Sequence, residues 1–295
     1  MSPAPATLAP CSAPSAGMSS RGYHRLAMYQ TCPQSFSYRF NLHIESARVA
    51  DPLALGSLGH IGLMHYYLRR LGRDVLDPFE AMRTQHARIA HQFSRAKDVL
   101  EAYMKRYATE SLRPLDVERE FCITASGQLH TQRADLVAEL GGKVVLIDHK
   151  FQARVSNASV TEWEISGQMI GYEVIGRSGI LQEMYGLPFG SVIVNFCRTT
   201  PPFGALDAFR RAPLSIAPAL AASFPPTVHE VNDMIDADAA SSRDPWSYRR
   251  NYEACVGRYG TCPYTLLCRV GKSALDGAYV CAVDGASDVR KGSGK

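Results

Sequence analysis

The chain has 295 residues, of which 46% are hydrophobic and 20% charged, proportions typical of a globular protein that can bury a full core. No apolar run reaches the roughly 18 residues that a membrane-spanning helix needs, so we do not expect this chain to be a membrane protein. The formal net charge of +4 is mildly basic, which permits a polyanionic partner without requiring one.

The first 20 residues, MSPAPATLAPCSAPSAGMSS, contain no charged side chain and are dominated by Ala, Pro and Ser. They lack the basic start and continuous apolar segment of a secretory signal, and they lack the arginines of a transit peptide. We expect residues 1–20 to be a disordered leader and residues 283–295 a flexible tail. Eight cysteines without a secretion signal indicate a reducing compartment.

Helical patterns come first along the chain. Residues 23–40 are predicted to form a helix that Pro33 disturbs or breaks. A second helix is predicted over residues 56–72, with Ser57 as its cap, and residues 78–107 read as a long amphipathic helix or a helix pair. One side of the second helix carries the apolar residues Ile61, Met64, Leu68 and Leu71.

Strand patterns dominate the middle of the chain. Three strands are predicted at about 116–124, 129–140 and 143–150, followed by a helix at 161–176 and a strand at 190–198. Further helical pieces lead to a segment rich in cysteine. The order of elements predicts a mixed α/β core, because helices are followed by a three-strand meander, a helix and a strand.

The second and third strands are joined by Gly141–Gly142, a strong signal for a two-residue hairpin. In such a hairpin Leu140 faces Lys143, so the numbers of facing residues add to the same total along the ladder. Asp135 and Asp148 fit this register. They are therefore predicted to lie opposite each other on one face, with Cβ atoms about 5 Å apart.

Two facing carboxylates repel each other unless a positive charge lies between them. A divalent cation such as Mg²⁺ or Mn²⁺ suits hard oxygen ligands, and Lys150 projects from the same face as Asp148. The alternative is a surface hairpin with a solvated Asp–Lys cluster. The strand KVVLI that precedes Asp148 is apolar and rich in β-branched residues, which favours burial and so the metal site.

These residues carry a resemblance to a known family. Asp135 followed after a gap by IDHK resembles the paired acidic motifs of the PD-(D/E)XK nuclease superfamily. LGSLGH, with His60, and QMIGY, with Gln168 and Tyr172, resemble motifs of its RecB-like exonuclease branch. VERE lies where that family often has an acidic residue, which makes Glu118 a weaker candidate. The sequence departs from the family at QRAD, where a Pro or Gly is usual near the first acid.

The resemblance implies a restriction-endonuclease-like core, in which helices flank a mixed sheet. It implies one nuclease domain over residues 21–282, with a helical insertion at about 56–110 and a cysteine-rich segment at 250–270. Its metal ligands would be His60, Asp135, Asp148 and the backbone carbonyl of His149. Its catalytic residues would be Asp135, Asp148, Lys150, Gln168 and Tyr172.

Each of these assignments has an alternative. His60 lies beside Met64 and could be a core histidine. Gln168 and Tyr172, one turn apart, could belong to an ordinary amphipathic helix. The side chain of His149 is expected on the face opposite Asp148 and Lys150, because successive residues of a strand alternate, so only its carbonyl is included.

Cys255, Cys262 and Cys268 lie within fourteen residues, and Cys32 lies far away near the start of the chain. They resemble the iron–sulfur subset of RecB-like nucleases, including CRISPR-associated adaptation nucleases, in which one early and three late cysteines hold a [4Fe–4S] cluster. The first gap of six residues is longer than is usual there. The alternatives are zinc, which usually takes two close pairs, or buried cysteines like those expected at Cys122 and Cys197.

The sequence therefore predicts a metal-dependent DNA nuclease, of exonuclease type, with an iron–sulfur cluster joining the ends of the fold. The alternatives are a non-catalytic nucleic-acid-binding or assembly module of the same fold, or a zinc-stapled DNA-binding protein. Expected partners are DNA, single-stranded or with duplex ends, and recombination, repair or CRISPR adaptation proteins. The expected location is the cytoplasm of a bacterial or phage-infected cell.

Overall fold

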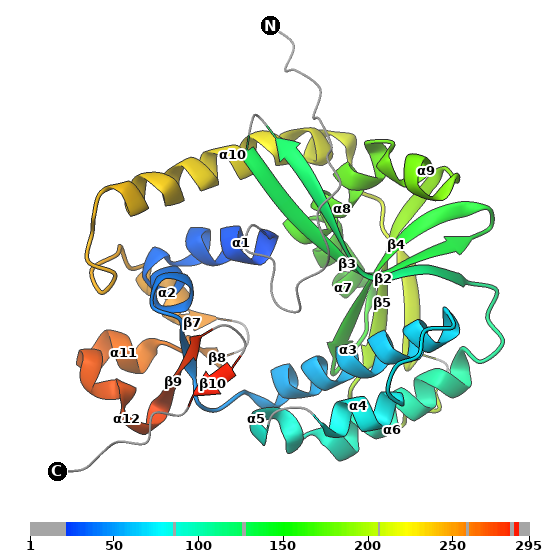
Figure 1. The fold of residues 1–295 in the computed structure, drawn as a ribbon, viewed down its shortest axis with the longest axis horizontal. Coiled ribbons are helices and arrows are strands. Elements are labelled where there is room, and N and C mark those ends of the chain that lie inside the picture. The colour runs from blue at the N-terminus through cyan, green and yellow to red at the C-terminus, as the bar shows by residue number, and fades with distance from the viewer. Residues whose placement is uncertain are drawn as a thin grey trace, which may run out of the picture. The chain divides into compact units, whose positions relative to one another are not determined.

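The structure is a computed structural model that describes residues 22–84, 87–125, 128–205, 207–257, 260–283 and 286–288. These residues form two compact units (Figure 1). The first unit comprises residues 50–226, and the second comprises residues 22–49 with 227–288. The sequence was expected to form one domain over 21–282. The predicted leader, 1–20, and much of the predicted tail lie outside the described residues.

A five-stranded sheet forms the centre of the first unit, in the order β2-β3-β4-β5-β6. β4 and β5 run parallel, and the other neighbours run antiparallel. Helices lie against this mixed sheet, which is the restriction-endonuclease-like core expected from the sequence (Figure 1). The strands are β2 (Arg113–Ala125), β3 (Gln128–Leu140), β4 (Lys143–Gln152), β5 (Phe189–Arg198) and β6 (Phe209–Pro213).

The hairpin between β3 and β4 has the predicted register. Gly141 and Gly142 both adopt positive φ angles, of 59° and 73°, which glycine tolerates without strain. Leu140 pairs with Lys143, and Leu136 pairs with Ile147. The apolar run of β4 is buried, as its β-branched composition predicts, and this burial anchors the strand in the middle of the sheet.

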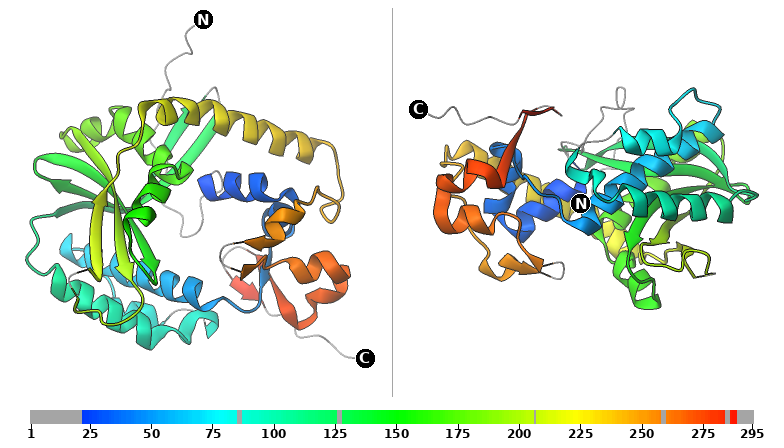
Figure 2. Two further views of the ribbon diagram at one scale, coloured as in Figure 1. Left: turned by 180° about the vertical axis from the view of Figure 1, so that it is seen from behind. Right: turned by 90° about the horizontal axis from the view of Figure 1, so that it is seen from below.

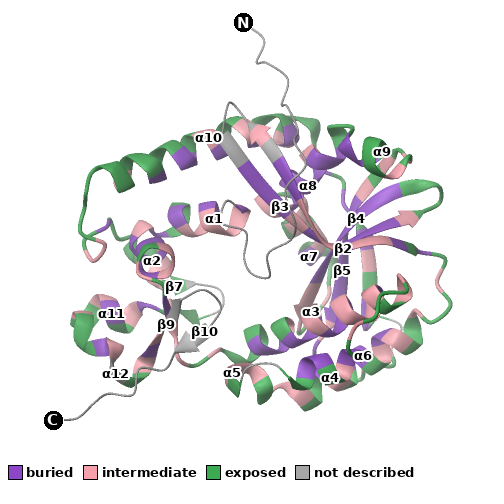
Figure 3. Ribbon diagram, in the orientation of Figure 1, coloured by how far each residue is buried: buried purple, intermediate pink, exposed green. Residues whose placement is uncertain are grey.

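One face of the sheet is covered by α3 (Asp51–Arg70), α4 (Pro78–Arg83) and α6 (Phe93–Arg106), which lie side by side (Figure 2). The short α5 (Ala87–Ala90) also contacts α3. Buried residues concentrate in the strands (Figure 3). The core between these helices and the sheet includes Leu55, Leu58, Leu63, Tyr67, Leu100, Tyr103, Leu136, Val145, Ile147 and Ile193.

Two helix predictions were wrong in their details. α3 begins at Asp51, so Ser57 lies inside it, and Ala50 is the N-cap. Pro52 in the first turn, where its missing N–H costs nothing, was the signal for this earlier start. The predicted apolar side is only partly buried and packs at the margin of the core. The predicted helix over 78–107 is three helices, α4, α5 and α6.

Two helices, α7 (Asn157–Glu164) and α8 (Gly167–Arg177), follow β4, where one helix over 161–176 was predicted. The break falls at Ile165 and Ser166, and Ser166 is the N-cap of α8. α8 contacts β3 and β5. α9 (Ile180–Tyr185) follows.

The second unit joins segments from both parts of the chain. α1 (Tyr23–Thr31) ends at Cys32 and α2 (Pro33–Phe36) begins with Pro33, so the predicted break is confirmed. A π-helical turn (Ser37–Asn41) and β1 (Ile44–Ser46) follow, and β1 pairs with β9 (Tyr279–Val283). The remaining elements are α10 (Pro218–Ala240), in which the unit boundary falls, a 3₁₀ turn (Tyr252–Cys255), β7 (Val256–Gly257), β8 (Gly260–Thr261), α11 (Thr265–Val270), a 3₁₀ turn (Gly271–Ala274), α12 (Leu275–Ala278) and β10 (Ala286–Asp288).

β10 pairs with β9, so this part of the predicted flexible tail is a strand. Within the described ranges, no helix has the length and apolar character required to cross a membrane.

Candidate active site and cysteine pocket

Asp148 and Lys150 lie two residues apart near the end of β4 and project from the same face. Lys150 Nζ lies 2.6 Å from Asp148 Oδ2 and donates to Gln168 Oε1 at 3.0 Å. Gln168 Nε2 donates in turn to Asp148 Oδ1 at 2.8 Å. The amide of one α8 residue therefore bridges the acid and the base of the strand. The structure brings these three predicted residues together.

Tyr172, one turn further along α8, completes this side of the cluster. Its hydroxyl donates to the backbone carbonyl of Arg133 on β3 and lies 3.3 Å from Asp148 Oδ1. The ring is fully buried, and burial, together with the charge of Asp148, raises the pKa of Tyr172 well above its usual value. Tyr172 therefore stays protonated and fixes α8 against the sheet.

The close approach of α8 to β3 depends on two residues that sequence reasoning missed. A Cβ atom at Gly171 would lie 1.9 Å from Nε2 of Gln132, so only glycine fits there without a shift. The buried Gln132 side chain donates to the backbone carbonyl of Gln168 at 3.0 Å. No motif marks Gln132, although it lies three residues before Asp135.

Asp135 lies where the β3–β4 ladder ends. Leu136 and Ile147 form the last pair, and Asp135 and Asp148 follow at the next position, as the predicted register requires. Asp135 Oδ2 accepts a hydrogen bond from the backbone N–H of His149 at 2.7 Å. The same oxygen lies 3.2 Å from His60 Nδ1 on α3. The structure therefore places His60 next to Asp135, and the family resemblance predicts that these two residues bind the same metal ion.

Glu118 joins the same group from β2. The pairs on either side of it, Val117–Leu136 and Arg119–Ala134, place Glu118 opposite Asp135. Its φ angle is +51°, a conformation that L-residues rarely adopt and that commonly marks functional sites. Its carboxylate forms an ion pair with Arg133 at 3.2 Å. Three adjacent strands therefore carry a carboxylate at the same level.

Burial and neighbouring charges shift the pKa values of these three acids in different directions. Burial and the charges of Asp135 and Asp148 raise the pKa of Glu118 to about 7, although Arg133 and His60 oppose the shift. Burial, with the charge of Asp135, also raises the pKa of Asp148 against the opposing effect of Lys150. Burial disfavours the charged form of Asp135 too, but His60, His149 and Lys150 outweigh it and lower that pKa. The charge of Asp135 thus contributes to the raised pKa of both neighbouring acids.

The two histidines near the acids behave differently. Burial disfavours the imidazolium of His60, but the charges of Asp135 and Asp148 outweigh it and raise the pKa. Burial dominates at His149 and lowers its pKa to about 3, so this ring is neutral. Its Nδ1 lies 2.7 Å from Asn195 Nδ2, and its ring stacks on Tyr67. The side chain of His149 thus faces α3 and α6, as strand alternation predicted, and Asn195 is a second neighbour that no motif revealed.

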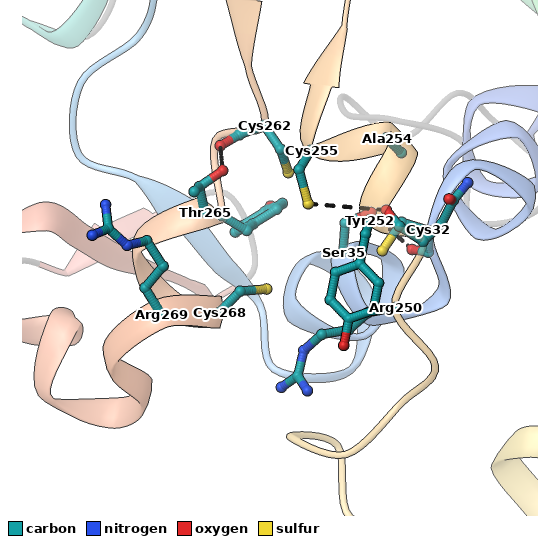
Figure 4. Close-up of a pocket in the computed structure, with 12 residues that line it drawn as sticks. Cys32, Ser35, Arg250, Tyr252, Ala254, Cys255, Cys262, Thr265, Cys268 and Arg269 are labelled. Carbon is teal, nitrogen blue, oxygen red and sulfur yellow. Dashed lines mark hydrogen bonds between the residues drawn. The ribbon is translucent and has the colours of Figure 1, made fainter.

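In the second unit, four cysteines line one pocket with a volume of about 230 Å³. Figure 4 shows Cys32 approaching from the junction of α1 and α2, with Cys255, Cys262 and Cys268 contributed by the later segment. All four are free thiols. Burial and the proximity of the other three cysteines raise the pKa of Cys262. The two segments that sequence reasoning joined through these cysteines do share one pocket.

The same two segments are also held by hydrogen bonds. Gln34 N donates to the backbone carbonyl of Arg249 at 2.9 Å, and the Gln34 side chain donates to that of Pro245, also at 2.9 Å. Tyr29 donates to the carboxylate of Asp238 at 2.6 Å. The approach of Cys32 to the other cysteines therefore rests on contacts that need no bound group.

Comparison with known proteins decides the family. The family model of the PD-(D/E)XK nuclease superfamily matches residues 23–269, which is most of the chain. The chain belongs to the PD-(D/E)XK nuclease superfamily. Among solved structures, a proposed exonuclease from Eubacterium rectale is similar at 10% identity and a TM-score of 0.48, with 85% of this chain and 93% of that one covered. SSO0001 is similar at 9% identity and a TM-score of 0.30, with 61% and 74% covered. No protein with a curated function matches.

PD-(D/E)XK nucleases generally use Mg²⁺ or Mn²⁺, and the donors present here fit such a cation. Glu118, Asp135 and Asp148 supply hard carboxylate oxygens. The pKa of about 7 at Glu118 reflects its burial together with the negative charges of Asp135 and Asp148, which a cation would offset. In the part of the chain that the structure describes, no three His, Cys, Asp or Glu side chains lie in a metal-holding arrangement. The acids are instead engaged with Lys150, Gln168 and His60.

Proposed function

We propose that this PD-(D/E)XK protein is a metal-dependent DNA nuclease that hydrolyses phosphodiester bonds and acts as an exonuclease of the RecB-like branch. One observation carries the proposal. Asp148, Lys150 and Gln168 all contact one another at 2.6–3.0 Å. Asp135 and Asp148 are the residues that follow the last pair of the β3–β4 ladder, one on each strand. An ordinary surface hairpin would not bury an acid to 1% exposure beside a second acid.

The chain's own residues have distinct tasks in this proposal. Asp135, Asp148, His60 and the backbone carbonyl of His149 would hold Mg²⁺ or Mn²⁺. When bound, the cation supplies Lewis-acid polarisation of the phosphate and a lower pKa for water. Lys150 places a positive charge where negative charge develops on the phosphate. Gln168 fixes both Asp148 and Lys150, and Tyr172 fixes Gln168 relative to the sheet.

We further propose that Cys32, Cys255, Cys262 and Cys268 bind a [4Fe–4S] cluster. Four free thiols around one pocket suit such a cluster, and the family resemblance favours it over zinc. The cluster would bridge residues more than 200 positions apart and so remove conformational freedom from the unfolded chain. Protein purified without oxygen should be brown and absorb near ~400 nm. A colourless protein that contains zinc would contradict this assignment.

The test of the nuclease is a cleavage assay with purified protein on single-stranded, linear duplex and circular DNA. Activity should require Mg²⁺ or Mn²⁺, should disappear with a chelator, and should spare circular DNA. Cleavage of circles would show an endonuclease. No cleavage of any substrate with either metal, in protein that still binds DNA, would favour the non-catalytic module.

A further inference from the structure

Lys150 has a third neighbour besides Asp148 and Gln168. Its Nζ lies 4.5 Å from the centre of the Trp163 ring, within the range of an attractive cation–π contact. The ammonium is therefore bounded by a carboxylate from its own strand, an amide from α8 and an aromatic face from α7. Trp163 belongs to none of the motifs that carry the family resemblance.

The position of Trp163 is built by contacts at both ends of α7. At its start, Arg210 of β6 donates to the side chain of Asn157 at 2.9 Å. At its end, the backbone N–H of Ser215 donates to the side chain of Glu164 at 3.0 Å. Because α7 is tied at both ends, Trp163 is held over Lys150. Its ring is only half-buried, so filling the core does not account for it.

The three neighbours differ in how a cation would affect them. Asp148 is a proposed metal ligand, and a carboxylate that shares its oxygens with a cation attracts an ammonium less strongly. Lysine has a flexible stem with several rotatable bonds, so a weakened ion pair would allow it to leave the site. The ring of Trp163 binds no metal, and its attraction for the ammonium persists.

We propose that Trp163 is a positioning residue that keeps Lys150 at the site while Asp148 shares its carboxylate with a cation. This inference rests on the proposed nuclease function. It adds an aromatic support for the lysine, contributed by the short helix between β4 and α8.

The test compares Trp163→Leu, Trp163→Phe and wild type in a steady-state DNA cleavage assay with Mn²⁺. Trp163→Leu should lower kcat roughly 5- to 30-fold, the size expected for one cation–π contact, and leave KM within about twofold. Trp163→Phe keeps an aromatic face and should retain most of kcat. Trp246→Leu is the matched control, because it removes a similar contact with Lys272, at 5.3 Å, in the second unit.

A second readout needs no turnover. The chain has two tryptophans, so in a Trp246→Phe protein the fluorescence reports on Trp163 alone. Adding Lys150→Met to that protein should change the Trp163 emission. Unchanged emission would overturn the contact.

Other outcomes are equally decisive. A raised KM with unchanged kcat would mean that Trp163 contacts DNA and would overturn the positioning role. So would a loss of activity that follows the melting temperature in all Trp163 variants. If wild type cleaves and Trp163→Leu equals it, only this inference is wrong. If wild type cleaves no DNA, the proposed function is wrong and the inference is wrong with it.

Discussion

Replacing Asp148 by Asn should affect activity and stability in opposite directions. Asp148→Asn should lower cleavage roughly a thousandfold or more, because it removes a charge that both the cation and Lys150 need. The raised pKa of Asp148, caused by burial and Asp135, means that its ionised form opposes folding. The melting temperature in metal-free buffer should therefore be equal to or above that of wild type. Normal cleavage by the Asp148→Asn protein would end this assignment.

Glu118 should give a pH-dependent signature in metal-free buffer. Its pKa is raised to about 7, so its contribution to stability is complete below the unfolded value near 4.5 and is lost as pH rises through about 7. Wild type should lose up to about 2–3 kcal/mol over this window relative to Glu118→Gln. Thermal melts of both proteins from pH 4.5 to 8 in a chelator would measure it. If the melting temperatures of the two proteins changed with pH in parallel, Glu118 would not be buried beside Asp135 and Asp148.

His60 can be tested as a ligand through the metal requirement. If His60 binds the cation, His60→Ala should raise the half-saturating Mn²⁺ concentration about tenfold or more. Mn²⁺ should support at least as much activity as Mg²⁺, because it accepts nitrogen more readily, and Ca²⁺ should permit DNA binding without efficient cleavage. A destabilised His60→Ala protein with unchanged half-saturation would make His60 a core residue only.

At the scale of elements, the distance between α3 and β4 determines whether His60 reaches Asp135. A Cβ at Gly59 would lie 2.2 Å from the ring of Phe151, so Gly59→Ala should push the helix and strand apart. We expect a loss of about 1–3 kcal/mol in stability and a clear fall in cleavage. Phe151→Leu in the same protein should restore part of both, because it removes the atoms that clash.

Gly56→Ala is the matched control in the same helix. Its Cβ would lie 3.9 Å from Phe151, an ordinary contact, and alanine favours helix by about 1 kcal/mol over glycine. This variant should be as stable as wild type or more so. If Gly59→Ala behaved like Gly56→Ala, close packing at Gly59 would not be what positions His60.

The sequence predicted local patterns better than boundaries and contacts. Gly141–Gly142 specified the β3–β4 register, because a two-residue turn leaves one pairing, and this register placed Asp135 level with Asp148. The start of α3 was missed because Ser57 competed with the Asp51–Pro52 signal. The break between α7 and α8 was missed because the helical pattern continues through it.

Contacts between elements are less accessible from the sequence. Gln132 and Asn195 act through partners that lie 36 and 46 residues away in the chain, and no local pattern encodes such distances. Glu118 was only a weak candidate, since its place opposite Asp135 follows from the β2–β3 register rather than from a turn adjacent to it. Family resemblance grouped the motif residues, and the supporting residues needed coordinates.

At the scale of the whole molecule, the cysteine pocket makes a prediction about iron. Cys32→Ser should lower iron content and solubility together, because three thiolates hold a [4Fe–4S] cluster poorly. Cys197→Ser is the control, since Cys197 is a free and fully buried thiol of β5 in the first unit. It should keep its iron. The measurement is the molar ratio of iron to protein in both variants. A Cys32→Ser protein with the iron content of wild type would show that Cys32 is not a ligand.

The composition of the second unit also has a consequence for synthesis on the ribosome. Residues 22–49 leave the ribosome before residues 50–226, but their partners Asp238, Pro245 and Arg249 lie about 200 residues later. At 5–20 residues per second, this segment waits roughly 10–40 s, while residues 50–226 already have the whole sheet. The first unit can therefore fold before the partners of residues 22–49 have been synthesised, whereas the second unit can form only later. Nascent chains stalled near residue 245 should resist protease across the sheet and be cut within residues 22–49.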